Sequence, residues 1–139
     1  MTVPMQYAHA SERFERFMRD AQTRLDRVTS HQTYQSVHAV LRVFRRRLTP
    51  QEGLDFANVL PAVLRAIFVE DWNLSEPVRP FASRTDLTRE VQQVRVNHNL
   101  SPDTVIADIA AALRSQVDPV AFEACLGRIG PEARDFWAV

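Results

Sequence analysis

The stretch LTPQEGLDFANVLPAVLRAIFVEDW, residues 48–72, decides the fold, because one continuous run holds a helix start, a helix stop and a final aromatic residue. Thr49 is followed by a proline and, three residues after Thr49, by Glu52, which predicts a capping box at the start of a helix. Pro61 has no backbone N–H and would clash inside a helix. We therefore expect Pro61 to end this helix and to open another that runs to about Val69.

Apolar residues at helical spacing extend this reading to the rest of the chain. Four helices are expected over residues 11–69, the second of them capped within Ser30–Thr33. The segment 70–84 has two prolines and no periodicity, which indicates an extended link. Four more helices should follow. The first begins near Asp86 and ends at about Asn97. The second begins at a Ser101-Pro102 cap, where Leu100 before the cap would form a hydrophobic staple. The last two begin at Asp118-Pro119 and at Pro131.

The two halves of the chain repeat each other. The apolar stripe and Thr-Pro cap within Val37–Pro50 match the stripe and Asp-Pro cap within Ile106–Pro119, at an offset of 69 residues. A stripe, a cap and a proline that recur at one offset indicate duplication of a four-helix unit.

We therefore predict an all-α fold, with a single domain over residues 1–139. The domain should be an eight-helix bundle built from two stacked four-helix repeats, about 11–69 and 85–139, joined by the extended link 70–84. Stacking would bury the apolar face that each repeat leaves open.

The net charge of the chain gives no reason to expect a general electrostatic attraction to charged partners. Seventeen basic residues, all arginine, balance seventeen acidic ones, so the formal net charge is zero and gives no general attraction to nucleic acid or to an anionic membrane. The distribution is uneven, because residues 1–48 hold nine arginines and four acids, about +5, and residues 49–139 hold eight arginines and thirteen acids, about −5. No apolar run approaches the roughly 20 residues of a membrane span, and the first ten residues lack a basic, apolar leader. We expect a cytoplasmic protein.

The decisive stretch carries a set of short motifs. They are Ala39-Val40-Leu41, Leu48-Thr49-Pro50, Glu52, Leu60-Pro61, Leu64-Arg65 and Phe68-Val69-Glu70 with Trp72. In these motifs the chain resembles, over nearly its whole length, a bacterial family called domain of unknown function 2267. The resemblance implies an all-helical domain without an assigned reaction. Two positions depart from the family pattern: Val59 stands where the pattern has Gln, and Asp71 stands where it has Gly.

Four arginines, Arg42, Arg45, Arg46 and Arg47, form the densest basic cluster, at the end of the second expected helix. Helical spacing puts Arg42 and Arg46 on the outer face, whereas Arg45 and Arg47 flank the apolar seam. A helix of this kind can contact nucleic-acid phosphates. The zero net charge, and the lack of a helix-turn-helix signature or of a stacking aromatic among the arginines, favour instead a solvated face or pairing with the acidic second half.

Glu70, Asp71 and Trp72 place two carboxylates beside a large aromatic ring at the start of the irregular link. A ligand shelf could form there. The plainer alternative is that Trp72 pins the link to the bundle while the acids stay in water. Adjacent residues rarely aim at one atom, so these two carboxylates do not by themselves make an acid–base pair.

We predict no catalytic residue, no cofactor and no metal site. Glycine occurs only at 53, 127 and 130, which excludes a glycine-rich phosphate loop. His31 and His38 are seven residues apart, so they lack the spacing that lets two imidazoles share a zinc ion on one helix. Cys125, the single cysteine, lies on an apolar helical face and is expected to be a buried structural thiol.

These features favour a non-enzymatic protein-interaction or regulatory module. Its partner would be another protein or a second copy of the chain, bound through the oppositely charged regions or through an exposed aromatic end at Phe136-Trp137. Neither nucleic acid nor a membrane is an expected partner. Two alternatives stay open: nucleic-acid binding through the Arg42–Arg47 helix, and a small-ligand site or an enzyme in the groove between the repeats.

Overall fold

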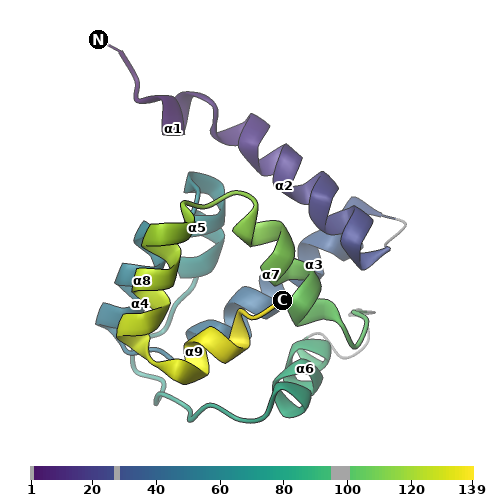
Figure 1. Ribbon diagram of the computed structural model, residues 1–139, viewed down its shortest axis with the longest axis vertical. Helices are drawn as coiled ribbons and strands as arrows, with labels where there is room; N and C mark the ends of the chain where they lie inside the picture. Colours follow the sequence, from purple (N-terminus) through teal and green to yellow (C-terminus); the bar gives the residue numbers. More distant parts are fainter. Residues whose placement is uncertain (1, 27–28, 95–100) are drawn as a thin grey trace.

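The computed structural model describes residues 2–26, 29–94 and 101–139, and within them it contains only helices and irregular segments (Figure 1). The helices are α1 (Met5–Ala8), α2 (Ala10–Leu25), α3 (Ser30–Arg45), α4 (Pro50–Asn58), α5 (Ala62–Val69), α6 (Arg84–Gln93), α7 (Val105–Arg114), α8 (Pro119–Ile129) and α9 (Pro131–Phe136). This confirms the all-α prediction. The four-residue helix α1 is one more than the eight helices expected.

The start and stop signals of the decisive stretch are confirmed. Thr49 Oγ1 accepts a hydrogen bond from the backbone N–H of Glu52 (3.2 Å), and Glu52 Oε1 accepts one from the N–H of Thr49 (2.8 Å). This reciprocal capping box begins α4. Pro61 then stands directly before α5, as predicted.

Side-chain caps fix the starts of three other helices. Ser83 accepts a hydrogen bond from the backbone N–H three residues on (3.1 Å) at α6, and Asp118 accepts one from the N–H two residues on (3.2 Å) at α8. Thr29 caps α3 in the same way (3.1 Å). The prediction of a cap within Ser30–Thr33 is therefore wrong by one residue, because Ser30 is already helical and Thr29 has the extended backbone that a cap needs.

The predicted cap at Ser101 is also wrong. A turn separates it from α7, which begins at Val105 with no side-chain cap. Ser101 is buried instead, and its hydroxyl lies 2.7 Å from that of Ser36 on α3. The expected staple residue Leu100, and the expected helix end near Asn97, lie outside the described residues.

Helix α3 forms the centre of the fold. Ten of its residues are buried, and it packs against α2, α5, α6 and α7. At its C-terminal end Phe44 meets Trp137, with ring centroids 5.3 Å apart, and Phe136, at 4.9 Å. Trp137 is 0% exposed and Phe136 is 1% exposed, so the expected exposed aromatic end at Phe136-Trp137 is wrong: both rings lie in the core, packed on Phe44.

The two halves pack reciprocally. Helix α2 packs on α7, α6 packs on α3, and α4 packs on α8, so each half places its first helix on the second helix of the other half (Figure 1). Two stacked repeats α2–α5 and α6–α9 would produce this arrangement. It is consistent with the predicted duplication, which itself stays a prediction.

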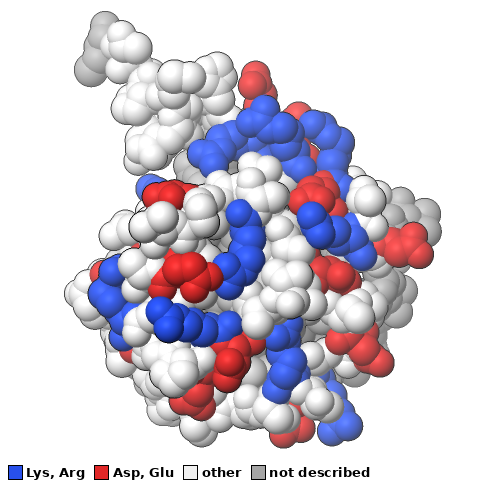
Figure 2. Space-filling view, in the orientation of Figure 1, with Lys and Arg blue, Asp and Glu red and all other residues white. Residues whose placement is uncertain are grey.

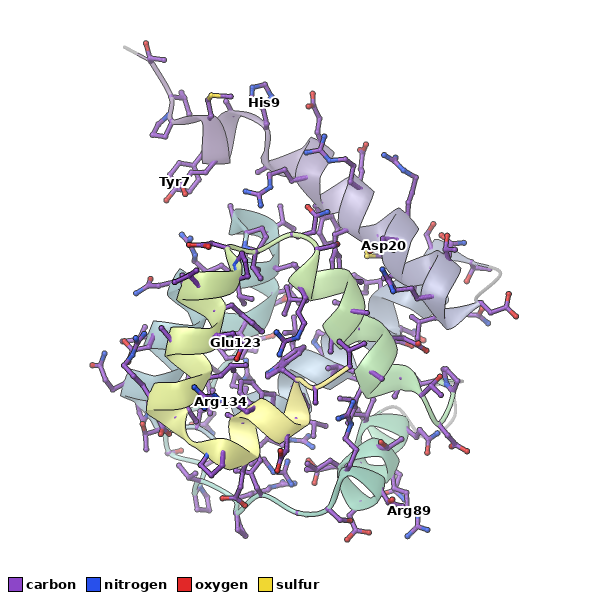
Figure 3. The ribbon with its side chains drawn as sticks, viewed as in Figure 1. Tyr7, His9, Asp20, Arg89, Glu123 and Arg134 are labelled. Atoms are coloured by element: carbon purple, nitrogen blue, oxygen red, sulfur yellow. The ribbon has the colours of Figure 1, made fainter. Side chains whose placement is uncertain are left out.

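The N-terminal segment projects beyond the helical body. Tyr7 and His9 lie on this projection in Figure 3. Val3, Met5 and Tyr7 are 58%, 75% and 49% exposed, and α1 has no buried residue. Within residues 2–26, 29–94 and 101–139, none of the helices has both the length and the hydropathy that crossing a membrane requires.

Candidate functional site

The arginine cluster lies where α3 ends, opposite the start of the α5–α6 link. Arg42 and Arg45 belong to the last turn of α3, and Arg46 and Arg47 follow it directly. Cations are favoured here because the carbonyl end of a helix carries partial negative charge. The link is tied to this helix end by a hydrogen bond from the backbone N–H of Arg79 to the carbonyl of Arg46 (2.9 Å).

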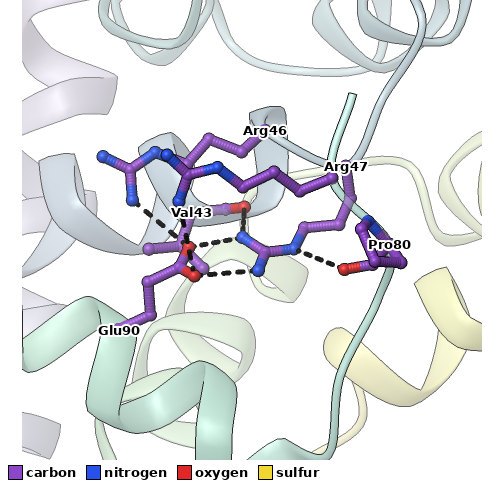
Figure 4. Close-up of polar contacts among 6 residues, drawn as sticks. Val43, Arg46, Arg47, Pro80 and Glu90 are labelled. Atoms are coloured by element: carbon purple, nitrogen blue, oxygen red, sulfur yellow. Dashed lines mark hydrogen bonds and ion pairs between the residues drawn. The ribbon is translucent and has the colours of Figure 1, made fainter. Parts of the chain in front are cut away.

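Arg47 is part of the core, and all three of its guanidinium nitrogens donate hydrogen bonds. Its side chain is 5% exposed and forms a two-pronged ion pair with the carboxylate of Glu90 on α6, with Nη2 2.8 Å from Oε1 (Figure 4). It also donates to the carbonyls of Val43 (3.0 Å) and Pro80 (3.3 Å). Arg47 therefore holds α3, α6 and the link together.

Glu90 collects two further arginines on the same carboxylate. Arg46 Nη1 donates to Oε2 (3.2 Å; Figure 4). Arg79 Nη1 lies 3.7 Å from Oε1. The hydrogen bonds from Arg47 hold the pKa of Glu90 below its usual value, and Arg46 acts in the same direction, against the opposing effect of burial. Glu90 is therefore the negative centre of the cluster.

Arg45 is buried, and within the described ranges no carboxylate forms an ion pair with it. It is 5% exposed, and its Nη1 donates to the carbonyls of Phe68 (2.9 Å) and Glu70 (2.8 Å). Its Cζ lies 5.4 Å from the centre of the Trp72 ring, a cation–π contact. Burial, followed by the positive charge of Arg42, lowers the pKa of Arg45 to about 10, so it stays protonated at neutral pH.

Arg42 and Arg46 keep donors free for another molecule. Arg42 uses Nη2 for His38 Nε2 (3.0 Å) and, more weakly, for the carbonyl of Glu70 (3.4 Å). Arg46 uses Nη1 for Glu90. Among the described residues, no hydrogen-bond acceptor engages the remaining N–H groups of either side chain. Both are partly exposed, as their expected place on the outer face of the helix requires.

Trp72 anchors the start of the link, and Asp71 shapes its backbone. The Trp72 ring packs edge-on against Phe68, with centroids 6.0 Å apart, and lies over Gly53 of α4. Asp71 has φ +54°, in the left-handed region that glycine adopts most easily. The glycine of the family pattern at this position thus corresponds to a backbone requirement, which Asp also tolerates.

The cluster and the link enclose two adjoining pockets, which together we call the arginine groove. The smaller, of about 90 Å³, is lined by Arg42, Arg45, Arg46, Leu48, Asp71, Trp72, Glu76, Pro77, Val78 and Arg79. The larger, of about 460 Å³, is lined by Tyr34, Gln35, His38, Arg42, Arg46, Glu70, Asp71 and Val94. They share Arg42, Arg46 and Asp71, so the two sequence segments predicted as candidate surfaces meet in one groove.

Sequence reasoning missed Glu90 and Arg79. Glu90 lies beside the apolar stripe of α6 formed by Leu87 and Val91. An acidic residue next to a buried stripe was the one sequence feature that could have indicated its role. Arg79 gave no signal, because its approach to Glu90 depends on the path of the link. Arg47 pairs with Glu90, as expected if the arginines pair with the acidic second half of the chain.

The remaining candidate residues are the potential metal ligands and the single cysteine. Within the described ranges, no group of three or more His, Cys, Asp or Glu residues is placed to hold a metal ion. Cys125 is 0% exposed on α8, and burial raises the pKa of its thiol. The prediction of a buried structural thiol is confirmed.

The face shown in Figure 2 carries mixed charge. Basic side chains gather over α2, and acidic ones are interspersed among them and over the rest of the face. Ion pairs account for part of this pattern, such as Arg114 with Glu123 on α8 (2.5 Å) and Arg24 with Asp20 on α2 (2.9 Å). This face does not present a broad basic surface of the kind that tracks a phosphate backbone.

Comparison with known proteins gives a family match. Residues 14–136 match the family described as "Uncharacterized conserved protein (DUF2267)". Among curated proteins, none matches the chain. The match covers every helix from α3 to α9 and most of α2, and so it includes the whole arginine groove.

Proposed function

Since the chain belongs to the family of uncharacterized conserved proteins DUF2267, whose description names no reaction, we propose a function from the arginine groove: a non-enzymatic protein-interaction module that binds an acidic segment of another protein. The observation that carries the proposal is the pair Arg42 and Arg46. Both are partly exposed, keep unused N–H donors and line the same groove. Guanidinium groups with free donors are suited to carboxylate and phosphate groups.

The groove supports a local acidic contact better than a nucleic-acid backbone. Arg45 and Arg47, half of the cluster, are buried and donate to internal carbonyls and to Glu90. A nucleic acid could reach only Arg42, Arg46 and the half-exposed Arg79, with Asp71 and Glu76 beside them. Because affinity for nucleic acid scales with the number of phosphates neutralised, so few free cations favour a short acidic contact.

The cellular setting and the partner complete the proposal. We place the module in the cytoplasm, in keeping with its lone cysteine and the absence of a spanning helix among the described residues. The bound protein is a different chain in this proposal. Self-association through the oppositely charged halves is the alternative, and the intramolecular Arg47–Glu90 pair already uses part of the charge that it would need.

Affinity purification with charge-reversal variants tests the function. The tagged protein is isolated from its own host as wild type, as an Arg42→Glu/Arg46→Glu double variant and as an Arg89→Glu control. Arg89 is on α6 (Figure 3), its side chain is 69% exposed, and it lines neither pocket of the groove. We expect a stoichiometric protein partner with the wild type and the control, and its loss with the double variant. A partner retained equally by all three would contradict the proposal.

A further inference from the structure

We propose that the smaller pocket of the arginine groove binds the phosphate group of a phosphate monoester. This inference rests on the proposed function, because it names the chemistry of the acidic group that the groove accepts. Three observations carry it: the charge balance of the pocket, the burial of Arg45, and the larger pocket next to it.

The pocket has the net charge that a phosphate monoester neutralises. Four arginines line it, Arg42, Arg45, Arg46 and Arg79, against two acids, Asp71 and Glu76, which leaves a formal charge of +2. Behind it, Glu90 and Arg47 form an ion pair that adds no net charge. A phosphate monoester carries about −1.5 to −2 at neutral pH, whereas a carboxylate or a sulfate ester carries only −1.

Arg45 is the buried cation that a bound anion would stabilise. It is 5% exposed, and no carboxylate among the described residues lies within ion-pairing distance of it. Its Nη1 donates only to carbonyls, which leaves Nε and Nη2 for another acceptor. A buried charge without an ion-pair partner costs free energy. The positive charges of Arg42 and Arg46 add to that cost, and the nearby carboxylates of Glu76 and Asp71 offset part of it. An anion in the pocket offsets both effects.

The second pocket supplies room for the rest of the ester. The smaller pocket, about 90 Å³, has space for a few water-sized groups and hence for one tetrahedral phosphate. The larger pocket, about 460 Å³, shares Arg42 and Arg46 with it as lining residues. There Tyr34 and His38 stack with centroids 6.1 Å apart, an aromatic wall beside the cations. The arrangement suits an ester with an organic body better than a free inorganic ion.

Titration calorimetry with matched esters tests the phosphate requirement. Phenyl phosphate and phenyl sulfate share a ring and a tetrahedral head but differ in charge. We expect phenyl phosphate to bind the wild-type protein about tenfold or more tightly than phenyl sulfate, because hydrogen bonds to a more highly charged acceptor are stronger. Equal affinity for the two esters, or no binding of phenyl phosphate, would overturn the proposal.

Charge-neutral variants locate the site. Arg42→Gln and Arg46→Gln should each weaken phenyl phosphate binding by about tenfold or more, and Arg89→Gln should leave it unchanged. Thermal unfolding of each variant checks that it is folded. For the wild type, arginine side-chain NMR supplies an independent readout: Nε–H signals of Arg42, Arg45 and Arg46 should shift on titration, and that of Arg89 should not. Shifts confined to other arginines would contradict the site.

A peptide arm separates this inference from the proposed function. The probe is acetyl-Ala-phosphoserine-Ala-amide, with the serine peptide as its control. Tighter binding of the phosphopeptide than of phenyl phosphate identifies a phosphorylated partner protein as the source, and equal or weaker binding identifies a small phosphate ester. If no phosphate ester binds while the protein partner still depends on Arg42 and Arg46, the inference fails and the function stands. If esters bind and no protein partner is found, the function fails and the inference stands.

Discussion

Trp72 lies so close over Gly53 that a Cβ placed on the glycine would come within 2.0 Å of the indole Cη2 atom. Gly53 is buried in α4, where glycine is normally unfavourable, so the contact explains why the helix keeps it. The Trp72 ring therefore packs against α4, and it also makes the cation–π contact with Arg45. The position of Trp72, which lines the arginine groove, therefore depends on the absence of a side chain at Gly53.

Gly53→Ala should destabilise the fold by about 1–3 kcal/mol, because the new methyl group forces Trp72 out of its place. In a Trp72→Ala background the sign should reverse, and the same substitution should be neutral or stabilise by up to about 1 kcal/mol, since alanine is the better helix former. Urea unfolding of the four proteins of this double-mutant cycle measures both effects. Equal destabilisation in the two backgrounds would show that Trp72 is not the obstacle.

Asp71→Gly should be neutral or stabilise by up to about 1 kcal/mol, because φ +54° is a conformation that glycine adopts without a steric penalty. Asp71→Val should destabilise by about 1–2 kcal/mol, since a β-branched residue fits this region poorly. Asp71→Asn is the matched control and should change little. Thermal and urea unfolding give the order, and a valine variant as stable as the asparagine one would contradict the backbone account.

Glu90→Gln should cost on the order of 3 kcal/mol near neutral pH, because it leaves the buried guanidinium of Arg47 without a counter-charge. The pKa of Glu90 is lowered in the folded state, so its stabilising contribution is present above the ordinary glutamate pKa and is lost as the pH falls through the lowered value. The difference between wild type and variant should therefore shrink in acid. Urea unfolding at about pH 7 and about pH 3 tests this, with Glu15→Gln, at an exposed position of α2, as the control. A difference that is the same at both values would contradict it.

Cys125 should be unreactive in the native protein, because it is 0% exposed and burial raises the pKa of its thiol. Reaction with Ellman's reagent should be slow in buffer and rapid in concentrated urea. The rate in buffer should follow the rate of opening and not the reagent concentration once the reagent is in excess. A rapid, concentration-dependent reaction of the folded protein would show that the thiol is accessible.

Local signals predicted most of the helix boundaries. Thr49 with Glu52, Pro61 and Asp118 act through neighbours within a few residues, so their roles are readable from the sequence. Ser101 misled the prediction because its hydroxyl meets Ser36 across the fold, a contact that no local pattern encodes.

The candidate site was predictable in part. The helical stripe correctly separated Arg42 and Arg46, which stay partly exposed, from Arg45 and Arg47, which are buried. The partners of the buried pair were beyond sequence reasoning. Glu90 is 43 residues from Arg47, and the carbonyls that accept from Arg45 depend on where α5 ends.

The central claim is that the cluster divides into arginines that hold the fold and arginines that are free to bind. Urea unfolding of Arg42→Gln, Arg46→Gln and Arg47→Gln, without any ligand, tests it most directly. We predict losses of at most about 1 kcal/mol for Arg42→Gln and Arg46→Gln, whose side chains are partly exposed. Arg47→Gln should lose about 3 kcal/mol or more, since it removes the two-pronged partner of Glu90 and the hydrogen bonds to the carbonyls of Val43 and Pro80. Losses of equal size for all three would contradict the division, because Arg42 and Arg46 would then be structural as well.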